Sequence, residues 1–187
     1  MSLRFTKIIM KFLSQKTILI FGLIFAFASF AFAQTKRETG IDLFKQGKNK
    51  EAVAVLEKAS KQKETKTDAE VWSYLGLAYM KNGNLKKAIK ALEKAVNFNP
   101  QNSTHRTNLA YAYFLNNKLN KAQDESTKAI ALDSQNADAY YVRGLARVFE
   151  GKYDDATNDA DKAININTDY SLAYILKSDA LLSKFGN

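Results

Sequence analysis

The hydrophobic pattern of the chain repeats at a fixed interval of about 34 residues, a period in the range of helical repeat units. Small residues mark this interval at four successive positions, Gly76, Ala110, Gly144 and Ser178. Alanines keep the same interval at two other phases: Ala88, Ala122 and Ala156, and then Ala95, Ala129 and Ala163. A helical repeat of this length predicts stacked two-helix units instead of one globular core. We expect the two helices of a unit to cross at Gly76, Ala110 and Gly144, where a larger side chain would force them apart.

Each unit has the pattern of two amphipathic helices. In the second unit, Trp72, Leu75 and Tyr79 follow three-to-four spacing, as do the alanine and leucine positions of its second half. The pair Asn82-Gly83 interrupts the pattern between the two halves, because Asn and Gly tolerate the positive φ of a helix C-terminus. The predicted units are residues 33–66, 69–102, 103–136 and 137–170. A half unit follows at 171–187, and we expect its helix, residues 172–183, to present a partly polar face as a cap.

The second unit carries a recognisable signature: Trp72, Leu75, Gly76, Tyr79, Ala88, Leu92, Ala95 and Pro100. In this order the residues match the W-x-x-L-G-x-x-Y, A-x-x-x-F, A and P positions of the tetratricopeptide repeat, with Leu92 in place of phenylalanine. The chain therefore resembles this family, although its first unit lacks the early aromatic residue. The resemblance implies an all-α, right-handed superhelix of about four helix pairs plus a C-terminal capping helix. It also implies a non-enzymatic function in holding other proteins.

In this family the first helix of each unit lines the concave wall of the superhelix. The residues at those phases are Ser73, Leu77 and Met80 in unit two, Thr107, Asn108, Tyr111, Phe114 and Leu115 in unit three, and Tyr141, Leu145, Val148 and Phe149 in unit four. They are mainly apolar and aromatic, whereas the family's best-known groove is a clamp of Lys, Arg and Asn for a peptide carboxylate. We therefore expect a hydrophobic or amphipathic protein segment to bind here. The alternative is that curvature buries much of this wall between neighbouring helices.

The fourth unit has Arg143 at the usual leucine phase and Asp159 in the helix that faces it. The resemblance to a known variant of the repeat implies an internal ion pair between these two residues. Alternatively, Arg143 could hold a ligand carboxylate, although an inward arginine without a partner would be costly. Arg147 has no predicted partner, and we expect it to be exposed at the helix end.

Little in the sequence could carry out catalysis or bind a cofactor. His105 is the only histidine and there is no cysteine, so no thiol nucleophile, disulfide or thiolate metal site is available. We expect His105 to be a surface residue. Asp154, Asp155, Asp159 and Asp161 lack the alternating ligands and central glycine of a calcium loop, and we expect these acids to pair with Lys152 and Lys162. Gly-rich phosphate-binding loops are absent from the sequence. We expect no enzymatic activity, no cofactor and no metal.

Residues 1–33 resemble a targeting sequence. Basic residues, with no acid among them, precede the apolar run Thr17–Ala33, which closes on Ala31-Phe32-Ala33. This order is typical of a secretory signal peptide, and we expect cleavage after Ala33 and export, with the periplasm as the favoured location. The alternative is an uncleaved inner-membrane anchor formed by residues 8–33, which is the only way in which we expect the chain to contact a membrane.

Charge adds a weaker indication. The net charge of the whole chain is +9, and it is concentrated in the first half, where lysines either attract acidic partners or form a solvated helix face. Nucleic-acid binding conflicts with export, and we do not expect it. The leading hypothesis is an adaptor or scaffold in the bacterial cell envelope that binds a protein or peptide partner. The alternative is the repeat module of a larger envelope protein whose effector domain, an energy transducer or protease, lies outside this chain.

Overall fold

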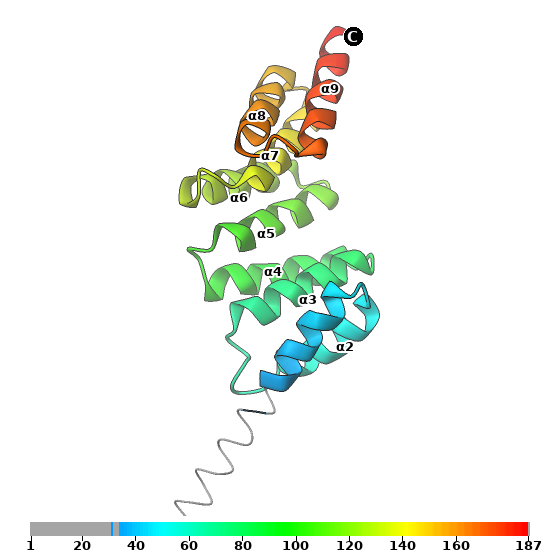
Figure 1. Cartoon of the computed structure of the whole chain (residues 1–187), viewed down its shortest axis with the longest axis vertical. Helices are drawn as coiled ribbons and strands as arrows, with labels where there is room; N and C mark the ends of the chain where they lie inside the picture. The colour runs from blue at the N-terminus through cyan, green and yellow to red at the C-terminus, as the bar shows by residue number, and fades with distance from the viewer. Residues whose placement is uncertain (1–30, 32–33, 187) are drawn as a thin grey trace, which may run out of the picture.

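The computed structural model describes residue 31 and residues 34–186. This part of the chain is entirely helical and rises as a stack of helices along one axis (Figure 1). A helix over 34–45 comes first. The helices that follow it are α2 (Asn49–Ala59), α3 (Ala69–Lys81), α4 (Leu85–Phe98), α5 (Ser103–Leu115), α6 (Leu119–Leu132), α7 (Ala137–Phe149), α8 (Tyr153–Ile166) and α9 (Ser171–Phe185). The predicted all-α superhelix of repeated helix pairs is confirmed.

The helix starts keep the sequence period. Asp68, Asn102 and Asn136 precede α3, α5 and α7, and each side chain accepts a hydrogen bond from a backbone N–H of the first helical turn. Such N-caps satisfy donors that the helix itself leaves without partners. Tyr170 occupies the same position before α9 and makes no side-chain cap. The last helix thus departs from the capping rule that the other three follow.

The turns inside the units need left-handed backbone. Gly47, Gly83 and Gly151 have φ of 75°, 75° and 76°, a region that glycine enters without steric cost. In unit three the equivalent residue is Asn117, with φ of 55°. The breaks in the sequence pattern within the units are therefore helix C-termini, and all of them use the same left-handed backbone conformation.

The small residues of the period allow close helix contact, as expected. A Cβ on Gly76 would lie 2.5 Å from Cγ of Leu92 in the second helix of the same unit. Gly144 differs, because a Cβ there would lie 2.7 Å from Cδ2 of Leu176 in α9. The residue equivalent to Leu92 in unit four is Ala160, which is too short to fill this space. The last helix thus completes the packing of unit four.

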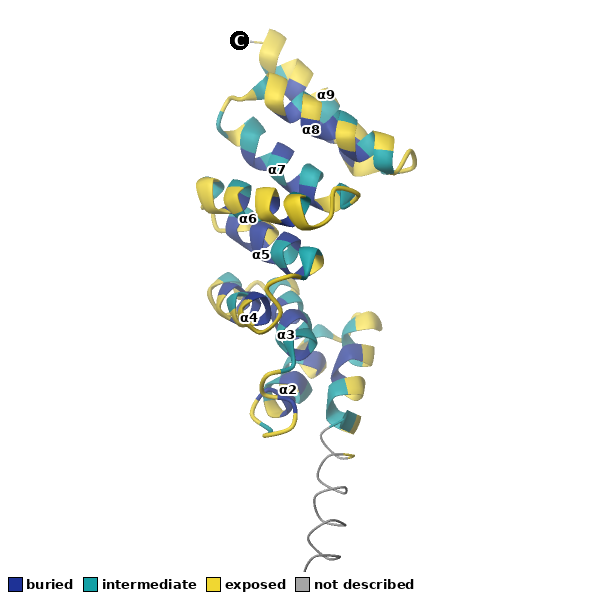
Figure 2. Ribbon diagram, turned by 90° about the vertical axis from the view of Figure 1, so that its left-hand side faces the viewer, coloured by how far each residue is buried: buried dark blue, intermediate teal, exposed yellow. Residues whose placement is uncertain are grey.

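The core runs along the whole stack and has no single centre (Figure 2). Its largest fully buried side chains include Leu56, Val71, Leu92 and Leu176, which come from α2, α3, α4 and α9. Each unit therefore buries its apolar stripes within its own helix pair and against its neighbours, as expected for a repeat protein.

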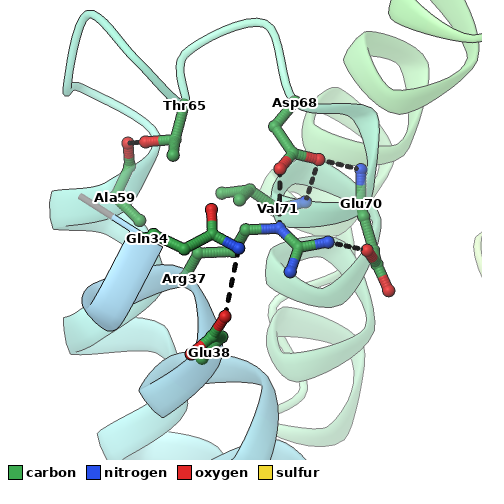
Figure 3. Close-up of polar contacts among 8 residues, drawn as sticks. All are labelled: Gln34, Arg37, Glu38, Ala59, Thr65, Asp68, Glu70 and Val71. Carbon is green, nitrogen blue, oxygen red and sulfur yellow. Dashed lines mark hydrogen bonds and ion pairs between the residues drawn. The ribbon is translucent and has the colours of Figure 1, made fainter. Parts of the chain in front are cut away.

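The degenerate first unit is joined to α3 by polar contacts (Figure 3). Arg37 Nε lies 2.7 Å from Asp68 Oδ2, and the same guanidinium contacts Glu70 in the first turn of α3. In the long connection after α2, the buried Thr65 hydroxyl donates to the Ala59 carbonyl at 2.5 Å. These contacts hold the polar connection against the helices.

The C-terminal helix caps the stack as expected: it buries Ala173, Leu176 and Ala180, and Ser178 and Asp179 of its expected polar face are exposed. Its surface is nevertheless more apolar than that of a solvating cap. Most of its large apolar side chains are exposed, including Ile175, Leu182 and Phe185, whereas Lys177 on the expected polar face is half-buried. The physical reason is register: α9 begins one repeat period after α7 and keeps the apolar phases of a first helix, and no second helix covers them among the described residues.

The predicted signal peptide, residues 1–33, lies outside the described residues except for residue 31. Within the part that the structure describes, every helix is too short or too polar to cross a membrane.

Candidate functional site

The first helices of the repeats line a groove with two cavities. The upstream cavity, of about 610 Å³, lies between α3, the end of α4 and α5, and its lining includes Ser73, Leu77 and His105. The downstream cavity, of about 350 Å³, lies between α5, α7 and the start of α9. Asn108 lines both cavities, so the two are neighbours along one groove.

The predicted concave residues differ in how much surface they offer. Tyr111, Leu115 and Phe149 are exposed, and Phe149 is the most open at 67%. The half-buried members are Leu77, Met80, Asn108, Phe114, Tyr141, Leu145 and Val148. Of the whole set, Leu77 and Asn108 line the upstream cavity with Ser73, and Asn108, Tyr111 and Tyr141 line the downstream cavity with Thr107.

Ser73 and Thr107 line the cavities but are largely buried, with exposures of 4% and 5%, so they offer a ligand little surface. Their hydroxyl groups also join successive units. Asn108 Nδ2 donates to Ser73 Oγ at 3.4 Å, and Asn136 Nδ2 donates to Thr107 Oγ1 at 3.1 Å. The first helix of the following unit packs directly over these residues. The pattern within one helix does not show how close this neighbouring helix comes.

Part of the aromatic wall packs against itself. The rings of Tyr111 and Phe114 are stacked with centroids 6.3 Å apart, and Phe149 meets Phe114 edge-on at 5.3 Å. The alternative that curvature buries the wall thus holds for Phe114. The outer faces of Tyr111 and Phe149 stay open, which leaves an apolar and aromatic surface beside the cavities.

Three tyrosines and one carboxylate dominate the downstream cavity. Tyr111, Tyr141, Tyr170 and Asp138 all line it. The Tyr170 hydroxyl donates to Asp138 Oδ1 at 2.5 Å, and the Tyr141 and Tyr170 rings lie 5.5 Å apart at 56°. Burial, followed by the hydrogen bond to Asp138, raises the pKa of Tyr170. Burial also raises the pKa of Tyr141, and the nearby Asp179 adds to the effect.

Sequence reasoning missed Asp138, Tyr170 and Leu172 in this cavity. One signal was available for Tyr170: it stands one repeat period after Asn136, at a position where the other units have a capping Asp or Asn. A tyrosine cannot cap a helix in this way, so its presence marks a local exception. Asp138 gives no such signal, since an acid in the first turn of a helix is ordinary.

His105 is buried, with 8% exposure, so the expectation of a surface histidine is wrong. The first turn of α5 packs beside the start of α3, and burial lowers the pKa of His105, opposed by the charges of Glu70 and Asp68. Its Nδ1 has no hydrogen-bond partner among the described residues. Glu70 and Asp68 both pair with Arg37, so the acids of the upstream cavity already have a cation.

The structure brings Arg143 and Asp159 together inside unit four. Arg143 Nη2 lies 2.7 Å from Asp159 Oδ1, and its Nε donates to Oδ2 at 3.1 Å. Arg147 Nη1 lies 2.7 Å from the same Oδ2, so the expectation that Arg147 is an exposed residue without a partner is wrong. Arg143 and Arg147 are one helical turn apart and therefore reach the same carboxylate. This cluster ties α7 to α8 and leaves Arg143 engaged within the protein.

Two other acids of α8 also form ion pairs. Asp154 pairs with Lys184 and Asp161 with Lys177, both on α9, where we had expected Lys152 and Lys162. Among the described residues, no cluster of three or more His, Cys, Asp or Glu side chains could hold a metal ion.

Comparison with family models assigns the repeats. Tetratricopeptide repeat models match residues 69–102, 91–124 and 137–170, and a TPR repeat model matches residues 40–83. The chain belongs to the tetratricopeptide repeat family.

Solved tetratricopeptide structures share this architecture. A crystal structure of MamA is 28% identical and covers 81% of this chain and 82% of its own, with a TM-score of 0.70. The first TPR of Spaghetti (RPAP3), bound to the HSP90 peptide SRMEEVD, is 28% identical and covers 62% and 91%, with a TM-score of 0.59. The second TPR domain of human RPAP3, in complex with the HSP70 peptide SGPTIEEVD, is 27% identical and covers 57% and 88%, with a TM-score of 0.54. A search of the curated proteins finds no match.

Proposed function

We propose that this tetratricopeptide protein is a non-enzymatic scaffold or adaptor of the bacterial cell envelope. It binds a hydrophobic or amphipathic segment of another protein in the groove formed by α3, α5, α7 and α9. The observation that carries the proposal is the groove itself, in which the exposed Tyr111 lines the downstream cavity and the exposed Phe149 packs next to it through Phe114. Exposed apolar surface of this kind supports protein binding.

The charges of the groove argue against an acidic peptide tail as the ligand. The HSP90 and HSP70 peptides in the two RPAP3 structures both end in Glu-Glu-Val-Asp. In the present chain neither cavity is lined by Lys or Arg, whereas Asp68, Glu70 and Asp138 line them. Arg37 already pairs with Asp68 and Glu70, so a tail with several carboxylates would find no lysine or arginine in either cavity lining and would meet the like charge of Asp138. The segment that fits is therefore hydrophobic or amphipathic, without a cluster of acidic residues.

Location in the envelope rests on the apolar run Thr17–Ala33 and the basic residues before it. We propose export to the periplasm with cleavage after Ala33. Cell fractionation followed by N-terminal sequencing tests this directly. A chain that begins at Gln34 in the periplasmic fraction is expected, and an intact N-terminus in the membrane fraction would show that residues 8–33 are an anchor.

The groove is tested by capture of partners with crosslinking. We expect Phe149→Asp and Tyr111→Asp to reduce recovery of the partners of the unaltered protein at least about tenfold, because each places a charge on an apolar contact surface. Leu77→Asp and Leu145→Asp extend the test to half-buried positions. Leu132→Asp is the matched control, since Leu132 is an exposed apolar residue at the end of a second helix. Recovery of the same partners by all folded groove variants would contradict the proposal.

A further inference from the structure

We infer that the downstream cavity receives a lysine or arginine side chain of the segment bound in the groove. The inference rests on the proposed function and names the chemistry of its partner. It starts from the three tyrosines and the carboxylate that line the cavity: Tyr111, Tyr141, Tyr170 and Asp138.

The three rings come from three different elements. Tyr111 belongs to α5, Tyr141 to α7, and Tyr170 directly precedes α9. The tilted arrangement of Tyr141 and Tyr170, with centroids 5.5 Å apart, forms a corner of the cavity and not a closed stack. Aromatic faces attract cations, and sites built from several rings are a common way to bind ammonium groups.

The charge of the cavity has the matching sign. Asp138 is exposed and accepts from the Tyr170 hydroxyl through Oδ1, while an ionised carboxylate can accept several hydrogen bonds. Within the described part of the chain, neither Asp138 nor the neighbouring Asp179 forms an ion pair, whereas Asp154, Asp159 and other acids do. No basic residue lines the cavity. A cation from outside would therefore find a carboxylate without a charged partner.

Elsewhere the chain supplies cations to its own rings. Lys94 lies 3.9 Å from the centre of the Trp72 ring, Lys121 lies 5.4 Å from Tyr113, and Tyr79 and Tyr140 have similar contacts. For the three cavity tyrosines, no such contact occurs among the described residues. Apart from the face of Tyr111 that stacks on Phe114, their ring faces are therefore available to a cation of a partner.

Tyr170 also stands where the repeat pattern calls for something else. Asp68, Asn102 and Asn136 cap their helices at this position, and Tyr170 leaves α9 without a side-chain cap. Its hydroxyl instead holds Asp138 at the cavity. A residue that gives up a local stabilising contact and builds a cavity wall is typical of a functional site. At about 350 Å³ the cavity is at the small end for ligand pockets, which suits one side chain.

Selection from a random peptide library tests the inference. The full-length chain is expressed, and the form that accumulates is purified and used as bait. We expect the recovered peptides to combine apolar residues with at least one Lys or Arg. For the best peptide, fluorescence anisotropy then measures the affinity before and after the basic residue is replaced by norleucine, which keeps the apolar stem and removes the charge.

Variants connect the basic residue to the cavity. Asp138→Asn should weaken binding of the basic peptide about fivefold to twentyfold and leave the norleucine peptide unchanged. Tyr141→Leu should also weaken the basic peptide, whereas Tyr141→Phe, which keeps the aromatic face, should bind almost normally. Asp155→Asn is the matched control, because Asp155 is another exposed acid in the first turn of a helix and lies outside the cavity.

Two different results would refute the groove function and the cation site separately. If no peptide is recovered above background, the proposed groove function is wrong. If peptides bind through Phe149 and Tyr111 but the basic residue is absent from them, or Asp138→Asn affects both peptides equally, the cation site is wrong and the groove function stands.

Discussion

Removal of the Asp159 carboxylate should destabilise the fourth repeat by about 3 kcal/mol. Asp159 has a side chain that is only 3% exposed, and it accepts hydrogen bonds from Arg143 at 2.7 and 3.1 Å and from Arg147 at 2.7 Å. Asp159→Ala leaves two guanidinium groups facing each other without the anion between them. The repulsion and the lost hydrogen bonds both favour separation of α7 from α8.

The magnitude follows from burial. Breaking a buried ion pair by removing one partner costs about 3–5 kcal/mol. The Arg143 and Arg147 side chains keep 16% and 22% of their exposure, so water can rehydrate them in part. This places the expected loss at the lower end, about 3 kcal/mol, which corresponds to a fall in Tm of roughly 6–12 °C for a domain of this size.

The second unit supplies the control. At the positions equivalent to Arg143, Arg147 and Asp159 it has Leu75, Tyr79 and Ala91, all buried. The triple variant Arg143→Leu, Arg147→Tyr, Asp159→Ala therefore replaces the ionic cluster by an apolar arrangement that the same fold already uses. We expect it to recover most of the stability lost in Asp159→Ala, because no charge remains buried without a partner.

Urea unfolding followed by far-ultraviolet circular dichroism measures both variants. Since repeat arrays can unfold in steps, amide hydrogen exchange should also show that the loss in Asp159→Ala is concentrated in α7, α8 and α9. The reasoning is refuted if Asp159→Ala costs less than about 1 kcal/mol, or if the triple variant is less stable than Asp159→Ala alone.

Three further predictions concern stability. Asn117→Gly should stabilise the protein by about 0.5 kcal/mol, because Asn117 has φ of 55°, whereas Asn116→Gly, at φ of −92°, should destabilise it; urea midpoints decide. Gly76→Ala should cost about 1–3 kcal/mol, because its Cβ would lie 2.5 Å from Leu92 Cγ. In a Leu92→Ala background the same change should cost less than about 1 kcal/mol, because only the contact with the Ala88 carbonyl oxygen at 3.2 Å remains and helix propensity favours alanine. Burial lowers the pKa of His105 from 6.5, so on acidification the unfolded chain takes up the histidine proton at a higher pH than the folded chain does. The free energy of unfolding should therefore fall as the pH drops below 6.5. In His105→Gln the urea midpoint should vary less with pH between about pH 7.5 and pH 5.

The repeat pattern predicts the helices better than it predicts their surfaces. The starts of α3, α5, α7 and α9 are evenly spaced by one repeat period, because every unit must present the same phases to its neighbours. Exposure depends instead on what the neighbouring helices place beside each side chain. Four residues stand at the same position of successive first helices, and their exposure differs: Ser73 and Thr107 are buried, Tyr141 is half-buried and Ile175 is exposed. The same phase is thus covered or open according to which helix comes next in the stack.

The contacts of charged and capping residues are also hard to predict from the sequence, for a related reason. A side chain as long as arginine reaches more than one partner, so the pairing of Arg147 with Asp159 could not be chosen over exposure from spacing alone. The burial of His105 likewise depends on the start of α3, which belongs to the preceding unit of the sequence. Contacts between units are fixed by the superhelix and not by local pattern.

In a repeat protein each unit can be compared with the others, so a residue that departs from the shared pattern can be interpreted physically. Arg143, Arg147 and Asp159 depart from the second unit together, and their charges satisfy one another inside the fold, so the cluster needs no ligand. Tyr170 departs alone. It leaves the first turn of α9 without a side-chain cap, at a typical cost of about 1 kcal/mol, and the contact that it gains holds Asp138 at a cavity instead of closing the helix end. A departure that is balanced within the protein explains stability, whereas one that leaves a carboxylate and aromatic faces open directs attention to a partner. By this criterion the start of α9, and not the ionic cluster of unit four, is where binding specificity should be sought.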